Sequence, residues 1–282
     1  MKQQLILAGA GAALLLSLFF FGKTVEKKQA PALPAAAQAE PAFSIDTYLQ
    51  TAKQKLTVSQ TGYVAALENN ISRGDLKAQQ TDDYKQLAAF WLDSAKDDLL
   101  YDYYIAEASK LVNTEKNLTF AARLILDNLR GEADLPKRSW KAGAAIELFD
   151  KAIELNPNND SLKVELGSTY ILGKGVAGDG QQTMKGVGIL KGVIAKDSMN
   201  MEAQLALGIG DVISGQYDKA ITRLPVVIKH EPGNIEAMSW LADAYAYYGD
   251  KQNAMKWYLE TKRLMNNPQF SKEVDERIKK LQ

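Results

Sequence analysis

Apolar and small residues recur along most of the chain at the three- and four-residue spacing of amphipathic helices, as in Ala254 and Tyr258. No segment alternates apolar and polar residues for long enough to indicate a half-buried strand. Ser44 and Thr57 are suitable N-caps for a helical pair over residues 44–73, and Gly74 is a suitable stop. The pattern therefore predicts an all-α chain with essentially no β-strand.

The helical pattern repeats along the sequence, most clearly near the C-terminus. Residues 240–245 (WLADAY) predict a first helix, residues 247–250 a turn, and Ala254 and Tyr258 one face of a second helix. One unit upstream, Leu207-Gly208 and residues 215–220 (GQYDKA) occupy the same places. Ala220 and Ala254 are 34 residues apart, which is the period of one class of helical-hairpin repeat.

On these motifs the chain resembles the tetratricopeptide repeat family over residues 141–266, with a looser match over residues 84–130. Residues 166–170 (LGSTY) match a first helix, and Ala145, Phe149, Ala152 and Pro157 match a second helix with its closing turn. The resemblance implies a right-handed superhelix (α-solenoid) of antiparallel helix pairs, in which small residues permit close helix approach and aromatic residues fill the gaps.

The sequence departs from the family pattern in three places. Gly167 and Gly186 are 19 residues apart, where about 12 is usual in a 34-residue repeat. We interpret the excess, at residues 173–180, as a flexible insertion in a hairpin turn. A second long connector (GEADLPKRSWK) is expected between residues 130 and 141, and Pro225 should kink a second helix or force local repacking.

The N-terminal region predicts a membrane anchor. Residues 5–22 carry no charge and would span about 27 Å as a helix, close to the thickness of a bilayer core. The alternative is a cleaved signal peptide with a site at residues 37–39 (AQA), but charged residues directly after the apolar run favour an anchor. Lys23, Lys27 and Lys28 favour a cytoplasmic body, whereas short N-terminal tails usually stay in the cytoplasm. We expect a periplasmic body, and the orientation stays open.

These observations divide the chain into six predicted parts. They are an N-terminal tail (1–4), a transmembrane anchor (5–22), an Ala/Pro-rich linker (23–43), divergent helical hairpins (44–135), tetratricopeptide-type repeats (136–266) and a C-terminal capping helix (267–282).

The lack of cysteine excludes cysteine nucleophiles, zinc–thiolate sites and iron–sulfur clusters. Lys plus Arg and Asp plus Glu both number 34, and this balance argues against nucleic acid as a partner. There is no cysteine, and we interpret the one histidine, His230, as a cation near a helix C-terminus. Residues 173–178 match G-x-G-x-x-G, but the match follows a helix where a dinucleotide fingerprint follows a strand. We therefore predict no enzyme activity, no catalytic or metal-binding residue, no cofactor and no small-molecule substrate.

The resemblance also implies where a protein or peptide partner would bind, because ligands of the family usually lie against the inner face of the first helices. Carried over by spacing, these positions are Val164, Ser168, Ile171, Leu205, Ile209, Val212, Ser239, Asp243 and Ala246. The Lys and Asn residues that clamp a peptide carboxylate in chaperone-binding relatives are missing, since Val164/Ser168 and Leu205/Ile209 occupy those positions. The groove would be apolar and suit an amphipathic helix or an extended apolar segment. Alternatively, these residues only pack against a neighbouring repeat.

The leading hypothesis is a non-enzymatic, membrane-tethered scaffold that binds a protein partner in this groove. A second is an assembly or maturation factor for envelope proteins, which the resemblance to membrane-anchored bacterial tetratricopeptide proteins implies. A third, from another class, is an enzyme with its active site in the loops at 131–141 or 172–183.

Overall fold

The computed structural model describes residues 43–282 except residues 75, 266 and 282, and within this part of the chain every regular element is a helix. The all-α prediction is confirmed there. The predicted anchor and all but the last residue of the predicted linker lie outside the described residues. None of the helices in the described part has the length and hydropathy needed to cross a membrane.

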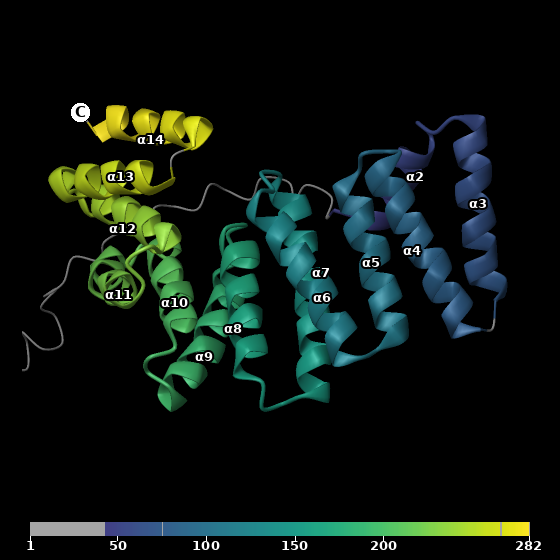
Figure 1. Cartoon of the computed structure of the whole chain (residues 1–282), viewed down its shortest axis with the longest axis horizontal. Coiled ribbons are helices and arrows are strands. Elements are labelled where there is room, and N and C mark those ends of the chain that lie inside the picture. Colours follow the sequence, from purple (N-terminus) through teal and green to yellow (C-terminus); the bar gives the residue numbers. More distant parts are fainter. Residues whose placement is uncertain (1–42, 75, 266, 282) are drawn as a thin grey trace, which may run out of the picture. The chain divides into compact units, whose positions relative to one another are not determined.

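Figure 1 shows the helices in chain order. They are α2 (Ile45–Lys53), α3 (Val58–Arg73), α4 (Lys77–Asp93), α5 (Asp98–Val112), α6 (Glu115–Arg130), α7 (Leu135–Leu155), α8 (Asp160–Thr169), the π-helix η1 (Tyr170–Gly175), α9 (Gly180–Lys196), α10 (Met201–Ile213), α11 (Tyr217–His230), α12 (Ile235–Tyr248), α13 (Lys251–Met265) and α14 (Pro268–Leu281). As predicted, Ser44 and Thr57 cap α2 and α3, and Gly74 ends α3.

From α4 onward, consecutive helices pack in pairs joined by short connections: α4 with α5, α6 with α7, α8 with α9, α10 with α11, and α12 with α13. Short connections require neighbouring helices to run antiparallel. The first helices of successive pairs, α6, α8, α10 and α12, also contact one another in that order. These four helices therefore share one face of the array.

The last two helix pairs repeat at an interval of 34 residues in their caps as well as in their core. Asn200 and Asn234 are the N-caps of α10 and α12, and each side chain accepts a hydrogen bond from the backbone N–H three residues later. Ala220 and Ala254, also 34 residues apart, are both fully buried. The corresponding cap of α8 is Asn159, which lies 41 residues before Asn200, so this repeat is seven residues longer.

The seven extra residues are not the flexible turn that the sequence predicts. The chain continues from α8 directly into η1, whose Tyr170, Ile171, Leu172 and Gly173 are buried, and α9 already begins at Gly180. A π-helix accommodates inserted residues in a helix without unwinding it. The correction is therefore that residues 173–175 belong to a π-helix that extends the first helix of the repeat, and only residues 176–179 form the turn.

The glycines of the G-x-G-x-x-G match serve this packing. A Cβ at Gly173 would lie 2.2 Å from the Cβ of Ala142 in α7, and one at Gly175 would lie 2.8 Å from Thr183 Oγ1 in α9. Gly178 has φ of +91°, a left-handed conformation that favours glycine in the turn before α9. Two glycines thus permit close contact and the third permits the turn.

The predicted long connector between residues 130 and 141 is also shorter than expected. Helix α7 begins at Leu135, with Asp134 as N-cap and Pro136 in its first turn, where its missing N–H leaves no hydrogen bond unmade. Arg138 in α7 donates to the carbonyl oxygens of Glu132 and Leu172 at 2.9 and 2.8 Å. The segment therefore fastens the end of α6 and the π-helix to α7. Further along, α11 continues through Pro225.

A buried ionic network lies where α5, α6 and α7 meet. Asp102 in α5 is fully buried, accepts a hydrogen bond from Asn128 Nδ2 at 2.7 Å, and lies 3.8 Å from Lys141 Nζ. Lys141 is also buried and lies closer, at 3.1 Å, to Glu132. Burial raises the pKa of Asp102 to about 7, although the hydrogen bond from Asn128 and the charge of Lys141 both lower it.

Because this carboxyl group has a higher pKa when folded than its ordinary value of 3.8, the folded state holds the proton more tightly. Between those two pKa values, the free energy of unfolding should fall as pH rises, by up to about 1.4 kcal/mol per pH unit. Asp102→Asn removes this titration. The free energy of unfolding is measured in urea at pH 5 and pH 8 for both proteins. From pH 5 to pH 8, that of wild type should fall by about 2 kcal/mol more than that of Asp102→Asn. A difference between the two proteins that is the same at both pH values would contradict the assignment.

Candidate functional site

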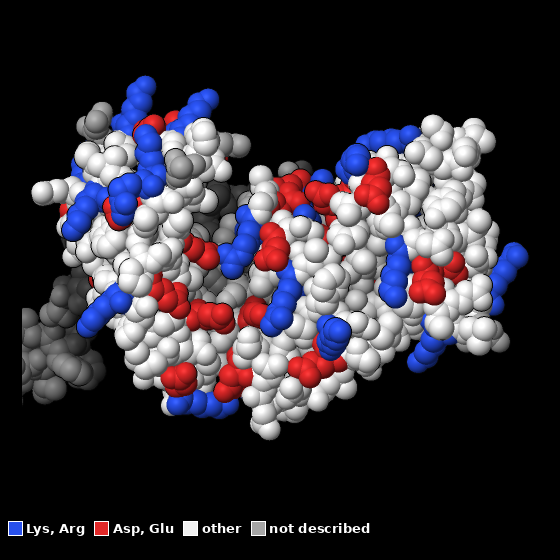
Figure 2. Space-filling view, in the orientation of Figure 1, with Lys and Arg blue, Asp and Glu red and all other residues white. Residues whose placement is uncertain are grey.

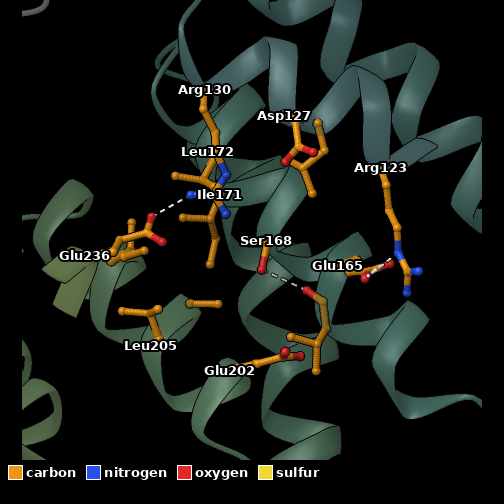
Figure 3. A pocket seen from close by; sticks show the side chains of 14 residues that line it. Arg123, Asp127, Arg130, Glu165, Ser168, Ile171, Leu172, Glu202, Leu205 and Glu236 are labelled. Carbon is orange, nitrogen blue, oxygen red and sulfur yellow. Dashed lines mark hydrogen bonds and ion pairs between the residues drawn. The ribbon is translucent and has the colours of Figure 1, made fainter. Parts of the chain in front are cut away.

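A pocket of about 380 Å³ opens on the face shared by the first helices. Its walls come from α6, α8, η1, α10 and α12, so four successive helix pairs contribute to it (Figure 3). The π-helix adds Ile171 and Leu172 to the lining. We call this pocket the groove.

Five of the nine binding residues predicted from the sequence line the groove. Val164, Ile171 and Ile209 are almost fully buried and form its floor, whereas Ser168 and Leu205 are half-buried and reach its surface. These three floor residues also belong to the hydrophobic cluster that runs from α5 to α10. They therefore pack between repeats and line the groove at the same time, so the two readings of the sequence do not exclude each other.

The other four predicted residues lie away from the groove lining. Val212 is buried in the cluster that joins α10, α11 and α12. Ser239 is half-buried on α12, and Ala246 packs against the buried cluster that α12, α13 and α14 form with Ala242, Ala254, Tyr258 and Val274. Asp243 accepts hydrogen bonds from the Tyr258 hydroxyl and from Arg277 Nη1, the latter at 2.8 Å, and so holds α13 and α14 to α12.

The groove is not the apolar channel predicted from the sequence, because charged residues form its walls. They are Arg123, Asp127 and Arg130 from α6, Glu165 from α8, Glu202 from α10 and Glu236 from α12. Acidic and basic side chains interleave on this face of the array (Figure 2). The sequence carried one signal for them: Glu202 and Glu236 are 34 residues apart and lie three residues before Leu205 and Ser239, hence on the same helix faces.

Two ion pairs cross the groove between helices. Arg123 Nε donates to Glu165 Oε1 at 2.8 Å, and Arg130 Nη1 donates to Glu236 Oε1 at 2.5 Å (Figure 3). The second pair joins α6 to α12, which are 106 residues apart at this contact. Burial raises the pKa of Glu165, the pair with Arg123 lowers it, and the nearby charges of Glu202 and Asp127 raise it further.

The groove does not hold an arrangement suited to nucleophilic or metal chemistry. Its one hydroxyl, on Ser168, donates to the carbonyl oxygen of Val164 at 2.9 Å within the helix. Among the described residues, no group of His, Asp and Glu side chains is placed to hold a metal ion. The arrangement combines an apolar floor with charged walls, which suits a segment with both apolar and charged side chains.

No family model matches the chain, and no curated protein matches it. Solved structures with some likeness include MamA (41-end) from Desulfovibrio magneticus RS-1, at 20% identity over 66% of this chain and 95% of that one, with a TM-score of 0.43. YrrB, described as a TPR protein with an unusual peptide-binding site, shares 15% identity over 77% of this chain and 99% of that one, with a TM-score of 0.42. PilW, described as a type IV pilus biogenesis factor, shares 16% identity over 71% of this chain and 92% of that one, with a TM-score of 0.44.

Since these TM-scores all lie below 0.5, the class of the protein rests on its own helices. Successive helix pairs, a 34-residue interval in caps and core, and first helices that share one face define a helical-hairpin repeat protein with a tetratricopeptide-like build.

Proposed function

We propose that this protein is a non-enzymatic, membrane-tethered scaffold that binds a segment of a protein partner in the groove. The observation that carries the proposal is the groove itself, which four helix pairs line with a buried apolar floor, the half-buried Leu205 and exposed or half-buried charged side chains. Repeat arrays typically bind extended partners on such a shared face. A groove of this size accepts a few side chains of a partner, whereas a catalytic site would need a reactive group that these residues do not supply.

The proposed tether is the uncharged segment at residues 5–22, followed by an Ala- and Pro-rich linker that would hold the helical body away from the bilayer. We propose that the helical body is periplasmic and that residues 1–4 lie on the cytoplasmic side of the membrane. A scaffold in this location would be suited to assist the assembly or maturation of envelope proteins. Reporter fusions after residue 43 test the orientation: activity of a reporter that works only in the cytoplasm would contradict it.

Leu205→Asp should abolish partner binding, because it places an unpaired carboxylate where the groove presents its half-buried aliphatic side chain. After crosslinking in native membranes, recovery of the specific partner should fall about tenfold or more, as expected for loss of a central contact. The matched control is Leu259→Asp on α13, where the leucine is 50% exposed and lies outside the groove. Circular dichroism of both variants checks folding. Undiminished recovery with folded Leu205→Asp would contradict groove binding, and unfolding would assign Leu205 to the core.

A further inference from the structure

The charges around the groove are unbalanced. Four carboxylates and two guanidinium groups line it, and both guanidinium groups are already paired, Arg123 with Glu165 and Arg130 with Glu236. Asp127 and Glu202 are exposed and make no ion pair or side-chain hydrogen bond with any described residue. The groove therefore presents two negative charges that the described residues leave unmatched.

Glu165 adds a third acceptor. Its Oε1 accepts from Arg123, but its Oε2 is buried and has no hydrogen-bond partner among the described residues. A buried acceptor without a partner costs free energy, and here Glu202 and Asp127 add like charge beside it. A cationic donor that enters the groove would supply the missing hydrogen bond to Glu165 Oε2 and would reduce the repulsion among the three carboxylates.

The floor decides which kind of cation fits. Val164, Ile171 and Ile209 close the bottom of the groove, and Leu205 presents a half-buried aliphatic side chain beside Glu202 on the same helix. Lys and Arg side chains bury their aliphatic stems along apolar surfaces while the charged end stays with polar groups. A bare metal ion or a small amine would leave the apolar floor uncovered.

We propose that the occupant of the groove is a partner segment that places a Lys or Arg side chain between aliphatic residues, with the cation near Glu202, Asp127 and Glu165 and the aliphatic neighbours on the floor. This inference rests on the proposed function, because it names the chemistry of the segment that the groove binds. The surplus of carboxylates disfavours an acidic segment by the same interactions.

Selection from a library of short random peptides displayed on phage tests this, with the full chain held in lipid nanodiscs and empty nanodiscs as background. We expect the selected peptides to be enriched in Lys or Arg flanked by aliphatic residues. Affinity of one synthesised selected peptide is then measured for wild type and for Asp127→Asn/Glu202→Gln. The double variant should bind about tenfold more weakly, since charge-assisted hydrogen bonds are lost.

The matched control is Asp93→Asn/Glu154→Gln, which removes the same charge from exposed positions outside the groove and should leave affinity unchanged. Selected peptides that are apolar without Lys or Arg enrichment, and that Leu205→Asp no longer binds, would overturn the cationic inference and leave groove binding standing. If both double variants lose the same affinity for the peptide, the cationic inference is also overturned. The peptide would then respond to the overall negative charge of the protein and not to the carboxylates of the groove. Absence of any enriched peptide would overturn the proposed function as well.

Discussion

Gly173→Ala is expected to destabilise the protein by about 2 kcal/mol or more, the usual result of forcing a methyl group into a packed core. The added Cβ would lie 2.2 Å from Ala142 Cβ and 3.1 Å from Leu129 Cδ1. Neither neighbour is the free end of a flexible surface chain, because Ala142 and Leu129 are both fully buried. The π-helix and α7 must therefore separate, which also disturbs Ile171 and Leu172 in the groove lining.

The control is Gly180→Ala at the start of α9, where an added Cβ meets nothing within 4 Å. It should be neutral or stabilising by about 0.5 kcal/mol, because alanine has the higher helix propensity and restricts the unfolded chain. Urea unfolding of the two variants measures the contrast. If Gly173→Ala proves as stable as wild type, the glycine does not serve the packing of η1 on α7.

Phe149→Ala should cost about 3–5 kcal/mol, the range for removing a large aromatic side chain from a core that cannot collapse. Phe149 in α7 has no exposed surface and belongs to the cluster that spans α5 to α10. The cavity would lie at the centre of the array, so the loss should appear in a single unfolding transition of the whole cluster.

Phe120→Ala in α6 is its control, because Phe120 is 60% exposed. A surface substitution of this kind should change stability by less than about 0.5 kcal/mol. Thermal and urea unfolding of the pair measure the difference. Comparable effects for the two variants would mean that the repeat positions read from the sequence do not mark the core.

The repeat positions were predictable because each has a local cause. A small residue at a close helix contact and an aromatic residue that fills a gap leave side-chain types that recur at a constant interval, as Ala220 and Ala254 do. The sequence reading was wrong where the outcome depended on distant contacts. Nothing near residues 170–175 signals a π-helix, because the residues that contact it, Ala142 and Arg138, lie on α7, about 30 residues earlier in the chain.

The groove was half-predictable for a related reason. The positions on α8 and α10 followed from the repeat, and five of the nine predicted residues line the pocket. The walls from α6 were missed because Arg123 and Arg130 lie in the region with the looser match, and their partners Glu165 and Glu236 are 42 and 106 residues away. Pairing at such separations depends on the stacking of helix pairs and leaves no local sequence pattern.

Site-specific photo-crosslinking tests the central claim, a protein segment bound in the groove, most directly. The photoreactive amino acid p-benzoylphenylalanine replaces Leu205 in the groove in one protein and Leu259, which is exposed on α13, in another. Irradiation in native membranes should give a discrete crosslinked partner from position 205 and none from position 259. A partner crosslinked from position 259 and absent from position 205 would place the binding surface elsewhere and contradict the account.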